Sequence, residues 1–284
     1  MSLLTILVLA VVQGVCELLP VSSSAHVIMA EKLMGLDPTA PEMTLLLVML
    51  HTGTMLAVIA YFWSSWRERY FVTSNAFRQV AKLVIVATAL TGVIGLALML
   101  FIERVILRGS EHAEVEQLFG NSYVIAAGLG TVGVMIILSA KQQPDASRRL
   151  GVRESAWIGA VQGLCLPFRG FSRSGSTIST GLFLGLDKVR VEEFSFALAV
   201  VLTPAVILKE GYRLLKANDG SMMIAGNLFT VAWPMVAGML FSFVAGLAAL
   251  RLLSRWLEHG RWHFFGYYCL GASAAVLVVE QLLR

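Results

Sequence analysis

The chain has 284 residues, of which 57% are hydrophobic and 14% are charged, and its mean hydropathy is +0.76. Because a soluble globular domain carries about 25% charged residues, this composition excludes such a domain and indicates a polytopic membrane protein. The net charge of +4 comes from basic residues between hydrophobic segments, a pattern that reports membrane orientation and argues against nucleic-acid binding.

An apolar segment over residues 4–19 predicts the first helix, which ends in a proline and a run of serines, PVSSSAH. The first three residues offer no basic stretch, so we expect this helix to be kept rather than cleaved as a signal peptide. Residues 25–35 predict a second helix, shorter than the roughly 20 residues that a membrane crossing needs. We therefore interpret residues 4–35 as a re-entrant helical hairpin.

Three longer apolar segments follow, at residues 43–63, 82–102 and 122–140, and each can cross a bilayer. A basic loop over residues 64–82 separates the first two. An acidic loop over residues 103–121 precedes the third, and a hydrophilic link runs from 141 to 153. The first half is thus predicted as one hairpin and three crossings.

The second half repeats this plan. V-Q-G-V-C at residues 12–16 recurs as V-Q-G-L-C at 161–165, and each copy is followed by a proline and a serine-rich run. A hairpin returns to its own side of the membrane and three crossings do not, so the second repeat is inverted relative to the first. Its predicted elements are short helices at 154–166 and 176–186 and spans at 194–215, 228–250 and 264–282.

The predicted fold class is an all-α polytopic integral membrane protein with an inverted-topology repeat, six transmembrane helices and two re-entrant helical hairpins. Residues 1–140 form the first repeat, 141–153 a cytoplasmic linker, and 154–284 the second repeat, with its hairpin at 154–186. Loops on the linker side hold 13 lysines and arginines against 7 on the other side. The linker side is therefore predicted to be cytoplasmic, with both termini outside.

Polar residues gather at the first break. Gln13 and Glu17 are four residues apart and share one helix face, and Ser23 and His26, three apart, share another. A bare carboxylate at membrane depth costs at least about 2.5 kcal/mol, so Glu17 needs a partner or a function. The alternatives are structural: Glu17 extending to the interface, and Ser23 capping a helix beside a packed histidine.

The second break, SRSGST at residues 172–177, puts an arginine, several hydroxyls and a glycine at the start of a short helix. Backbone N–H groups and the helix dipole favour an anion there, and the guanidinium of Arg173 matches phosphate oxygens. A salt bridge from Arg173 to Glu17 is the alternative. We expect the two breaks to converge on one phosphate site near the membrane midplane.

The motifs Q-x-x-x-E followed by P-V-S-S-S-A-H, and G-F-S-R-S-G-S-T in the second half, resemble those of the undecaprenyl-pyrophosphate phosphatase family of bacterial inner membranes, also called the bacitracin-resistance family. The resemblance covers essentially the whole chain. It implies hydrolysis of undecaprenyl pyrophosphate to undecaprenyl phosphate and inorganic phosphate, which recycles the lipid carrier of peptidoglycan synthesis, supports cell-wall biogenesis and cell shape, and confers bacitracin resistance. It also implies an active site that faces the periplasm.

By motif, Glu17 matches the acidic residue of the family, Ser23 the proposed nucleophile and His26 the proposed acid or base, while Arg173 is the fourth residue predicted to be catalytic. His51 is a further candidate, although the small residues around it equally suggest a close helix contact. The residues predicted to bind the phosphate or the substrate are Gln13, Ser22, Ser24, Ser172, Ser174, Gly175, Ser176 and Thr177.

The expected chemistry is in-line phosphoryl transfer, in which Ser23 attacks or positions water and Glu17 and His26 divide acid and base roles that the sequence leaves unassigned. No tightly bound cofactor is expected. The resemblance implies stimulation by magnesium or calcium, with Glu17 as the ligand, but Gln13 stands where many members have a second glutamate, which weakens any two-carboxylate metal scheme. The expected partners are a polyprenyl diphosphate lipid and the membrane, without nucleic acid, and a homodimer is compatible with the sequence.

Two rival functions fit parts of the pattern. Broken helices in inverted repeats also build secondary transporters, so a carrier of lipid phosphate is one alternative. The serine, histidine, glutamate and arginine set favours an enzyme, because a carrier needs no nucleophile beside a base. The other alternative, the phosphatidic-acid phosphatase superfamily, is disfavoured because its K-x6-R-P, P-S-G-H and S-R-x5-H-x3-D motifs are absent from the sequence.

Overall fold

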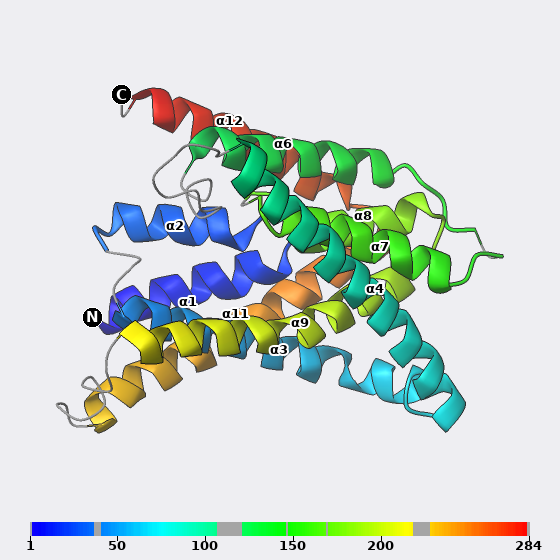
Figure 1. Ribbon diagram of the computed structural model, residues 1–284, viewed down its shortest axis with the longest axis horizontal. Coiled ribbons are helices and arrows are strands. Elements are labelled where there is room, and N and C mark those ends of the chain that lie inside the picture. Colours follow the sequence, from blue (N-terminus) through cyan, green and yellow to red (C-terminus); the bar gives the residue numbers. More distant parts are fainter. Residues whose placement is uncertain are drawn as a thin grey trace. The chain divides into compact units, whose positions relative to one another are not determined.

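The computed structural model describes residues 2–36, 41–106, 121–145, 147–168, 170–217 and 228–282 (Figure 1). Its regular secondary structure in these residues is helical throughout, which confirms the all-α prediction. The acidic loop predicted at 103–121 falls largely outside the described residues.

The short helices come in two pairs, as predicted. The first pair is α1 (Leu3–Leu18) and α2 (Ser23–Leu33), and the second is α7 (Val152–Cys165) and α8 (Arg173–Phe183). Both α2 and α8 begin two or three residues earlier than predicted, so that Ser23 and Arg173 are the first residues of their helices. The remaining helices are α3 (Pro41–Arg69), α4 (Ser74–Phe101) with its π-helical extension Ile102–Ile106, α6 (Ser122–Ser139), α9 (Lys188–Ala217), α11 (Leu228–Glu258) and α12 (His263–Leu282).

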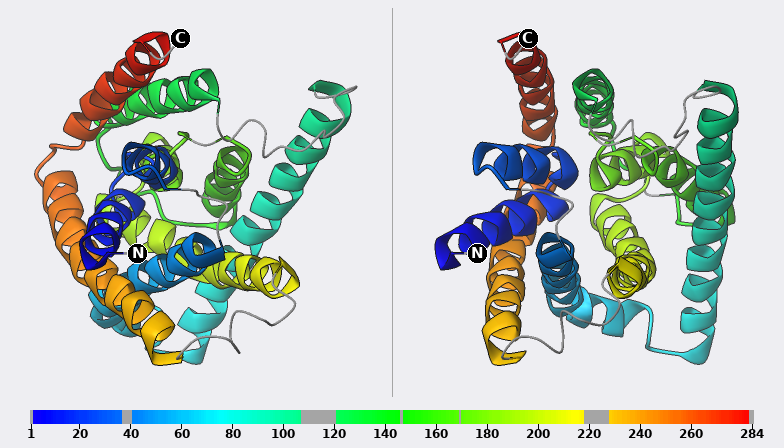
Figure 2. Two further views of the ribbon diagram at one scale, coloured as in Figure 1. Left: turned by 90° about the vertical axis from the view of Figure 1, so that its left-hand side faces the viewer. Right: turned by 60° about the vertical axis from the view of Figure 1, so that its left-hand side comes forward.

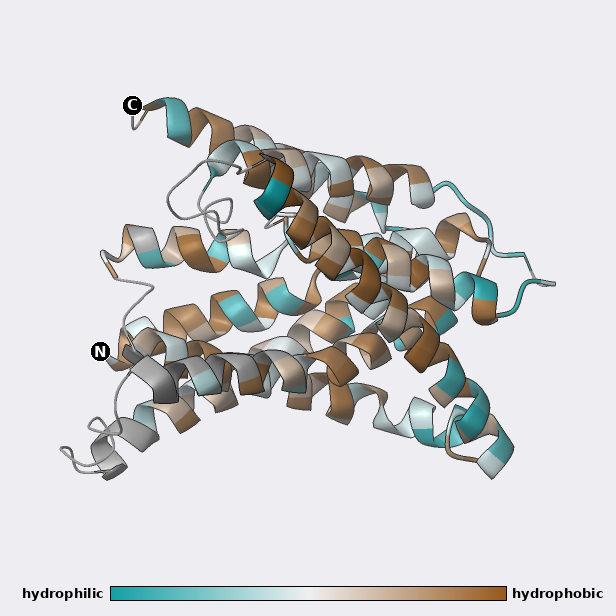
Figure 3. Cartoon of the chain, viewed as in Figure 1, coloured by the Kyte–Doolittle hydropathy of each residue, from teal (hydrophilic) through white to brown (hydrophobic). Residues whose placement is uncertain are grey.

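Three predicted loops are wrong in their bounds. The basic loop at 64–82 is reduced to the turn between α3 and α4, and residues 187–193 and 251–263, which lie between predicted helices and were therefore expected to be loops, are mostly helix. Arginine, lysine and glutamate are good helix formers, so a helix continues past its apolar stretch into charged residues. A new helix then begins at a capping residue: the side chain of Thr73 accepts a hydrogen bond from the backbone N–H of Ala76. Figure 3 shows hydrophilic residues on the ends of α3 and α4 that flank this turn.

Among the described residues, five helical segments are long and apolar enough to cross a membrane: Met43–Arg69, Ser74–Val105, Ser122–Ser139, Trp233–Glu258 and His263–Leu282. They agree with five of the six predicted spans. Helix α9 is not among them, and its first six residues include four charged ones, Lys188, Arg190, Glu192 and Glu193. The chain is therefore a multi-pass membrane protein, and the sixth span at 194–215 stays a prediction.

The chain folds into two compact units. Unit 1 comprises Met1–Leu18, Ser23–Trp63 and Ala199–Leu253; unit 2 comprises Leu19–Ser22, Ser64–Leu198 and Ser254–Arg284. Each unit draws helices from both halves of the sequence. The first hairpin is divided, because α1 and α2 belong to unit 1 whereas the four residues that join them belong to unit 2.

In unit 1, α1 and α3 pack on α11 around an aliphatic core that includes Ile6, Leu46 and Met235. Small residues let the backbones come close. A Cβ atom at Gly14 would lie 2.7 Å from the carbonyl oxygen of Ser242, so no larger residue fits this contact without a shift of the helices.

In unit 2, α4 packs along α7, and α6 packs along α12 and also contacts α8. Helices α6 and α12 run side by side in Figures 1 and 2. Gly133 and Gly266 face each other across this pair, and a Cβ atom at Gly266 would lie 2.7 Å from the Gly133 carbonyl oxygen. The indole of Trp262 donates to Ser139 at 3.0 Å, and Ser139 donates to Ser179 of α8 at 3.0 Å. These contacts fix the three helices that surround the second break.

Candidate functional site

The centre of the candidate site in unit 1 is a hydrogen bond between the two helices of the first hairpin. The hydroxyl of Ser23, at the start of α2, donates to Oε2 of Glu17, near the end of α1, over 2.6 Å. The chain turns back between these helices, which brings a hydroxyl and a carboxylate six residues apart into contact. A serine donating to a carboxylate is the arrangement of a nucleophile and its general base.

The Glu17 carboxylate is held from a second side. Gln13 is 1% exposed, and its side-chain amide donates to Glu17 Oε2 over 3.2 Å, as the four-residue spacing on α1 predicts. His51 of α3 lies next to the same pair, with Nε2 3.9 Å from Glu17 Oε2 and both ring nitrogens within 3.5 Å of the Gln13 amide nitrogen. The structure therefore brings together Gln13, Glu17, Ser23 and His51.

The segment around His51 makes a close helix contact through Gly53, while the His51 ring itself lies beside Glu17. Its Nδ1 lies 2.9 Å from the carbonyl oxygen of Leu47, which favours the proton on Nδ1 and leaves Nε2 to face Glu17. The neighbouring Gly53 makes the close helix contact, since a Cβ atom there would lie 2.3 Å from the carbonyl oxygen of Met239 in α11. The ring of His51 is thus oriented by a backbone carbonyl of its own helix, α3. Gly53 is the residue at which α3 packs closely against α11.

The break between α1 and α2 has an unusual backbone. Among the described residues, Ser22 is the non-glycine residue with a positive φ, at 68°. This left-handed conformation is costly for a residue with a Cβ atom, and such strain gathers at functional sites. Ser22 is buried, and Ser24 and His26 are half-buried in the first turn of α2, with His26 one turn after Ser23.

The second break, in unit 2, is built as an N-terminal helix cap. The hydroxyl of Ser172 accepts from the backbone N–H of Gly175 at 3.3 Å, and Arg173 is the first residue of α8. Gly175 packs against α6, where a Cβ atom would lie 2.8 Å from Val132. Ser174 donates to the carbonyl oxygen of Leu19 at 3.4 Å, so the joining residues of the first hairpin lie against this cap within unit 2. The cap and the dipole of α8 suit an anion.

The remaining predicted phosphate-binding hydroxyls have structural partners. Ser176 is fully buried and donates to the carbonyl oxygen of Ser172 at 2.7 Å. Thr177 is also fully buried, bonds the carbonyl oxygen of Arg173 at 2.9 Å, and lies 2.5 Å from the hydroxyl of Ser195 in α9. In contrast to these side chains, Arg173 is half-buried. Ser195 was missed by the sequence analysis, and its only signal is a serine between two phenylalanines in an apolar segment.

A second polar cluster in unit 2 contains none of the predicted site residues. Glu193 is 1% exposed and pairs with Arg69 at 3.0 Å, and it also accepts a hydrogen bond from Ser65. Its neighbour Glu192 is 2% exposed and accepts from Ser254 at 2.5 Å. Burial raises the pKa of Glu192 to about 8, against the smaller lowering effect of the Ser254 hydrogen bond.

The donor set at the first break fits a cation that is shared with the substrate. In the described residues, no three histidine, cysteine, aspartate or glutamate side chains gather as a metal-binding cluster. Glu17 offers one carboxylate, and the neighbouring Gln13 Nε2 is a donor in its contact with Glu17. Magnesium is commonly held by one or two carboxylates together with substrate phosphates. A single carboxylate such as that of Glu17 suits an ion that the phosphates of a bound ligand also coordinate.

The sequence matches the family described as bacitracin resistance protein BacA over residues 6–275. A relative from Acinetobacter baylyi, named undecaprenyl-diphosphatase 2, is 57% identical over 98% of each chain. A relative from Desulfosudis oleivorans is 31% identical over 92% of this chain and 93% of its own, and one from Korarchaeum cryptofilum is 28% identical over 98% and 99%; both are named undecaprenyl-diphosphatase.

Proposed function

The chain belongs to the BacA family of bacitracin resistance proteins, and we propose that it is a membrane phosphatase that hydrolyses undecaprenyl diphosphate to undecaprenyl phosphate and inorganic phosphate. In the cell this reaction returns the lipid carrier to cell-wall synthesis and confers resistance to bacitracin. The observation that carries the proposal is the 2.6 Å hydrogen bond from Ser23 to Glu17, because a carrier of lipid phosphate needs no hydroxyl paired with a base.

The first step is attack on the terminal phosphorus. Glu17 takes the proton of the Ser23 hydroxyl as Ser23 Oγ forms a bond to phosphorus and the bridging P–O bond breaks. The leaving group is undecaprenyl phosphate, and His26 is the acid that protonates it. Gln13 and His51 keep the carboxylate of Glu17 directed at Ser23. Water then hydrolyses the phosphoserine and releases inorganic phosphate.

From the SRSGST motif we infer that Arg173 and the first backbone N–H groups of α8 bind the oxygens of the transferred phosphoryl group. The guanidinium offers two parallel donors to phosphate, and the helix N-terminus adds a fixed partial positive charge. Charge stabilisation of this kind supplies much of the catalysis of phosphoryl transfer. A divalent cation bound by Glu17 and the diphosphate would neutralise further negative charge.

The proposal includes a membrane topology. We infer six spans, with residues 194–215 of α9 as the sixth, and two re-entrant hairpins in an inverted repeat. The active site and both termini then face the periplasm of a bacterial inner membrane, which the excess of basic residues on the linker side supports. A maleimide that cannot cross the membrane should label a cysteine in place of Leu3 and spare one in place of Arg149 in intact cells, and the reverse pattern would invert the topology.

The function is tested by phosphate release in detergent, where transport across a membrane cannot occur. Wild-type protein should release phosphate from undecaprenyl diphosphate and from farnesyl diphosphate, and Ser23→Ala, Glu17→Gln and Arg173→Ala should not. Ser64→Ala, which removes an exposed serine at the end of α3, is the matched control. The same measurements with EDTA show whether phosphate release requires a divalent cation. Folded wild-type protein that binds the lipid but releases no phosphate would support the carrier instead.

A further inference from the structure

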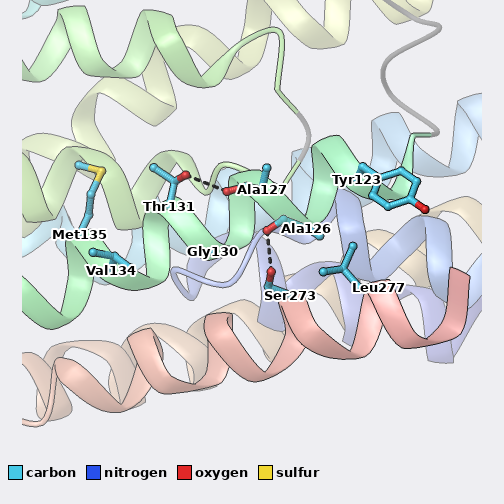
Figure 4. Close-up of a pocket in the computed structure, with 9 residues that line it drawn as sticks. All are labelled: Tyr123, Ala126, Ala127, Gly130, Thr131, Val134, Met135, Ser273 and Leu277. Carbon is cyan, nitrogen blue, oxygen red and sulfur yellow. Dashed lines mark hydrogen bonds between the residues drawn. The ribbon is translucent and has the colours of Figure 1, made fainter. Parts of the chain in front are cut away.

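Helices α6 and α12 form a groove in unit 2 with a volume of about 710 Å³, within the usual range of small-molecule sites (Figure 4). Its wall is hydrocarbon even where hydroxyls line it. The hydroxyl of Thr131 donates to the carbonyl oxygen of Ala127 at 2.8 Å, and that of Ser273 donates to the carbonyl oxygen of Ala126 at 2.7 Å. The hydroxyls of Thr131 and Ser273 are therefore bonded to backbone, the lining is otherwise apolar apart from the hydroxyl of Tyr123 at one end, and the groove suits an apolar chain.

The groove follows α6 from Tyr123, in its first turn, to Met135. The twelve residue steps from Tyr123 to Met135 correspond to about 18 Å along a helix. Both helices are candidate membrane spans, so the surrounding solvent of the groove is the bilayer rather than water. An occupant must then be an extended hydrocarbon chain or another apolar helix.

The inner end of the groove lies at the level of the second break. On its buried face, α6 contacts Gly175 through Val132 and Ile136, at 2.8 and 3.2 Å from the position of a Cβ atom. Val134 and Met135, in the same turns of α6, line the groove. One face of α6 thus packs against the N-terminal cap of α8, and another face of the same helix lines the groove.

We propose that this groove binds the isoprenoid chain of the substrate, an inference that rests on the proposed function. The chain is covalently attached to the diphosphate, so binding of the head group at the α8 cap raises the local concentration of the chain at a groove one helix away. The isoprenoid runs along α6 from the level of Gly175 toward Tyr123. A substrate with only three isoprene units does not reach the outer half of the groove.

The test fills the outer half of the groove and compares two substrates with the same head group. Ala127→Trp should lower the ratio of kcat/KM for undecaprenyl diphosphate to that for farnesyl diphosphate about tenfold, the usual scale for a lost apolar contact. Val278→Trp places the same side chain on an exposed position of α12 outside the groove and should leave the ratio at its wild-type value. A ratio that is unchanged in Ala127→Trp, or lowered equally in both variants, overturns the proposal.

A second measurement does not depend on hydrolysis. A photoreactive polyprenol without the diphosphate should label α6 and α12 of the wild-type protein, and Ala127→Trp should reduce this labelling while Val278→Trp does not. Equal labelling by a photoreactive phospholipid would assign the groove to bulk lipid, and disulfide-linked dimers of Thr131→Cys would assign it to a second copy; either result overturns the proposal. If wild-type protein releases no phosphate from either substrate, the proposed function fails, and the labelling still decides whether the groove holds an isoprenoid.

Discussion

The two hairpins share one plan but use their polar side chains differently. In the first, Ser23, Glu17 and Gln13 bond to one another, side chain to side chain. In the second, the hydroxyls of Ser176 and Thr180 donate to backbone carbonyls one turn earlier, at 2.7 Å each. Side chains that bond to one another can exchange protons, whereas hydroxyls bonded to backbone stiffen a helix. In the proposed mechanism the repeat thus supplies one scaffold for two tasks, proton transfer in the first hairpin and the binding of an anion in the second.

The two glutamines of the repeat show the same division. Gln13 donates to Glu17 and contacts His51, whereas Gln162, its counterpart, is fully buried and donates to Thr91 of α4 at 3.0 Å. The residue that corresponds to Glu17 in the second copy is Leu166, so Gln162 has no carboxylate to orient. One glutamine therefore serves the site and the other serves helix packing.

The largest expected effect separates the serines of the two hairpins. Ser23→Ala removes the nucleophile and should lower kcat at least about 10³-fold. Ser176→Ala removes a hydrogen bond to backbone and should cost about 1 kcal/mol of stability with a much smaller loss of kcat. Phosphate release and thermal unfolding of both variants check this. Comparable losses of kcat would show that the two hairpins share the chemistry.

The next largest effect is expected from substitution of Arg173. Removing the guanidinium in Arg173→Ala should lower kcat/KM about 10²- to 10³-fold, and Arg173→Lys should recover only part of it, because a lysine cannot bind phosphate through two parallel donors. Arg149→Ala, in the exposed linker, controls for the loss of a positive charge. Full recovery by lysine would mean that the charge alone matters, and that the geometry of the second hairpin does not.

Substitution of Gln13 should affect activity, whereas substitution of Gln162 should affect mainly stability. Gln13→Leu leaves the Glu17 carboxylate less well oriented and should lower kcat about tenfold. Gln162→Leu should affect stability only slightly, because the side-chain oxygen of Gln162 is buried without a hydrogen-bond partner in the described structure. Steady-state kinetics and unfolding temperatures of the pair distinguish the two roles. A loss of activity in Gln162→Leu that exceeds the loss in Gln13→Leu contradicts the division.

The smallest effect concerns the buried carboxylates of unit 2. The pKa of Glu192 is raised from 4.5 to about 8, so between these values the folded protein binds a proton that the unfolded chain has released. Stability from this group is therefore lost as pH rises through that window. The unfolding temperature of wild-type protein should fall between pH 5 and pH 8 more than that of Glu192→Gln. An equal fall of the unfolding temperature with pH in the two proteins would mean that Glu192 is already ionised in the folded protein across this pH range.

Much of the fold could be predicted from the sequence, because hydropathy and breaks report directly on helices in a membrane. The two pairs of short helices and five of the six predicted spans lie close to their predicted positions. Loop bounds were wrong where charged helix formers extend an apolar helix, as at the end of α3. Apolar length alone cannot locate such ends, and only capping residues such as Thr73 mark them.

The candidate site was predictable in part. The contact of Gln13 with Glu17 follows from their spacing on one helix. The contact of Ser23 with Glu17 depends on the turn at Ser22. Ser22 has a left-handed backbone conformation, which a serine at that position does not predict. His51 comes from a different helix, and Ser195 from another, so their contacts depend on tertiary packing that helical periodicity does not contain.

The three cysteines, Cys16, Cys165 and Cys269, are all buried free thiols. Their burial agrees with the interpretation of these residues as part of the packing, and Cys269 also donates to the carbonyl oxygen of Pro20 at 3.2 Å. Thiols without access to solvent react slowly with labelling reagents. The native cysteines should therefore give little background labelling. A spin label or fluorophore on one introduced cysteine would report on that position without replacement of Cys16, Cys165 or Cys269.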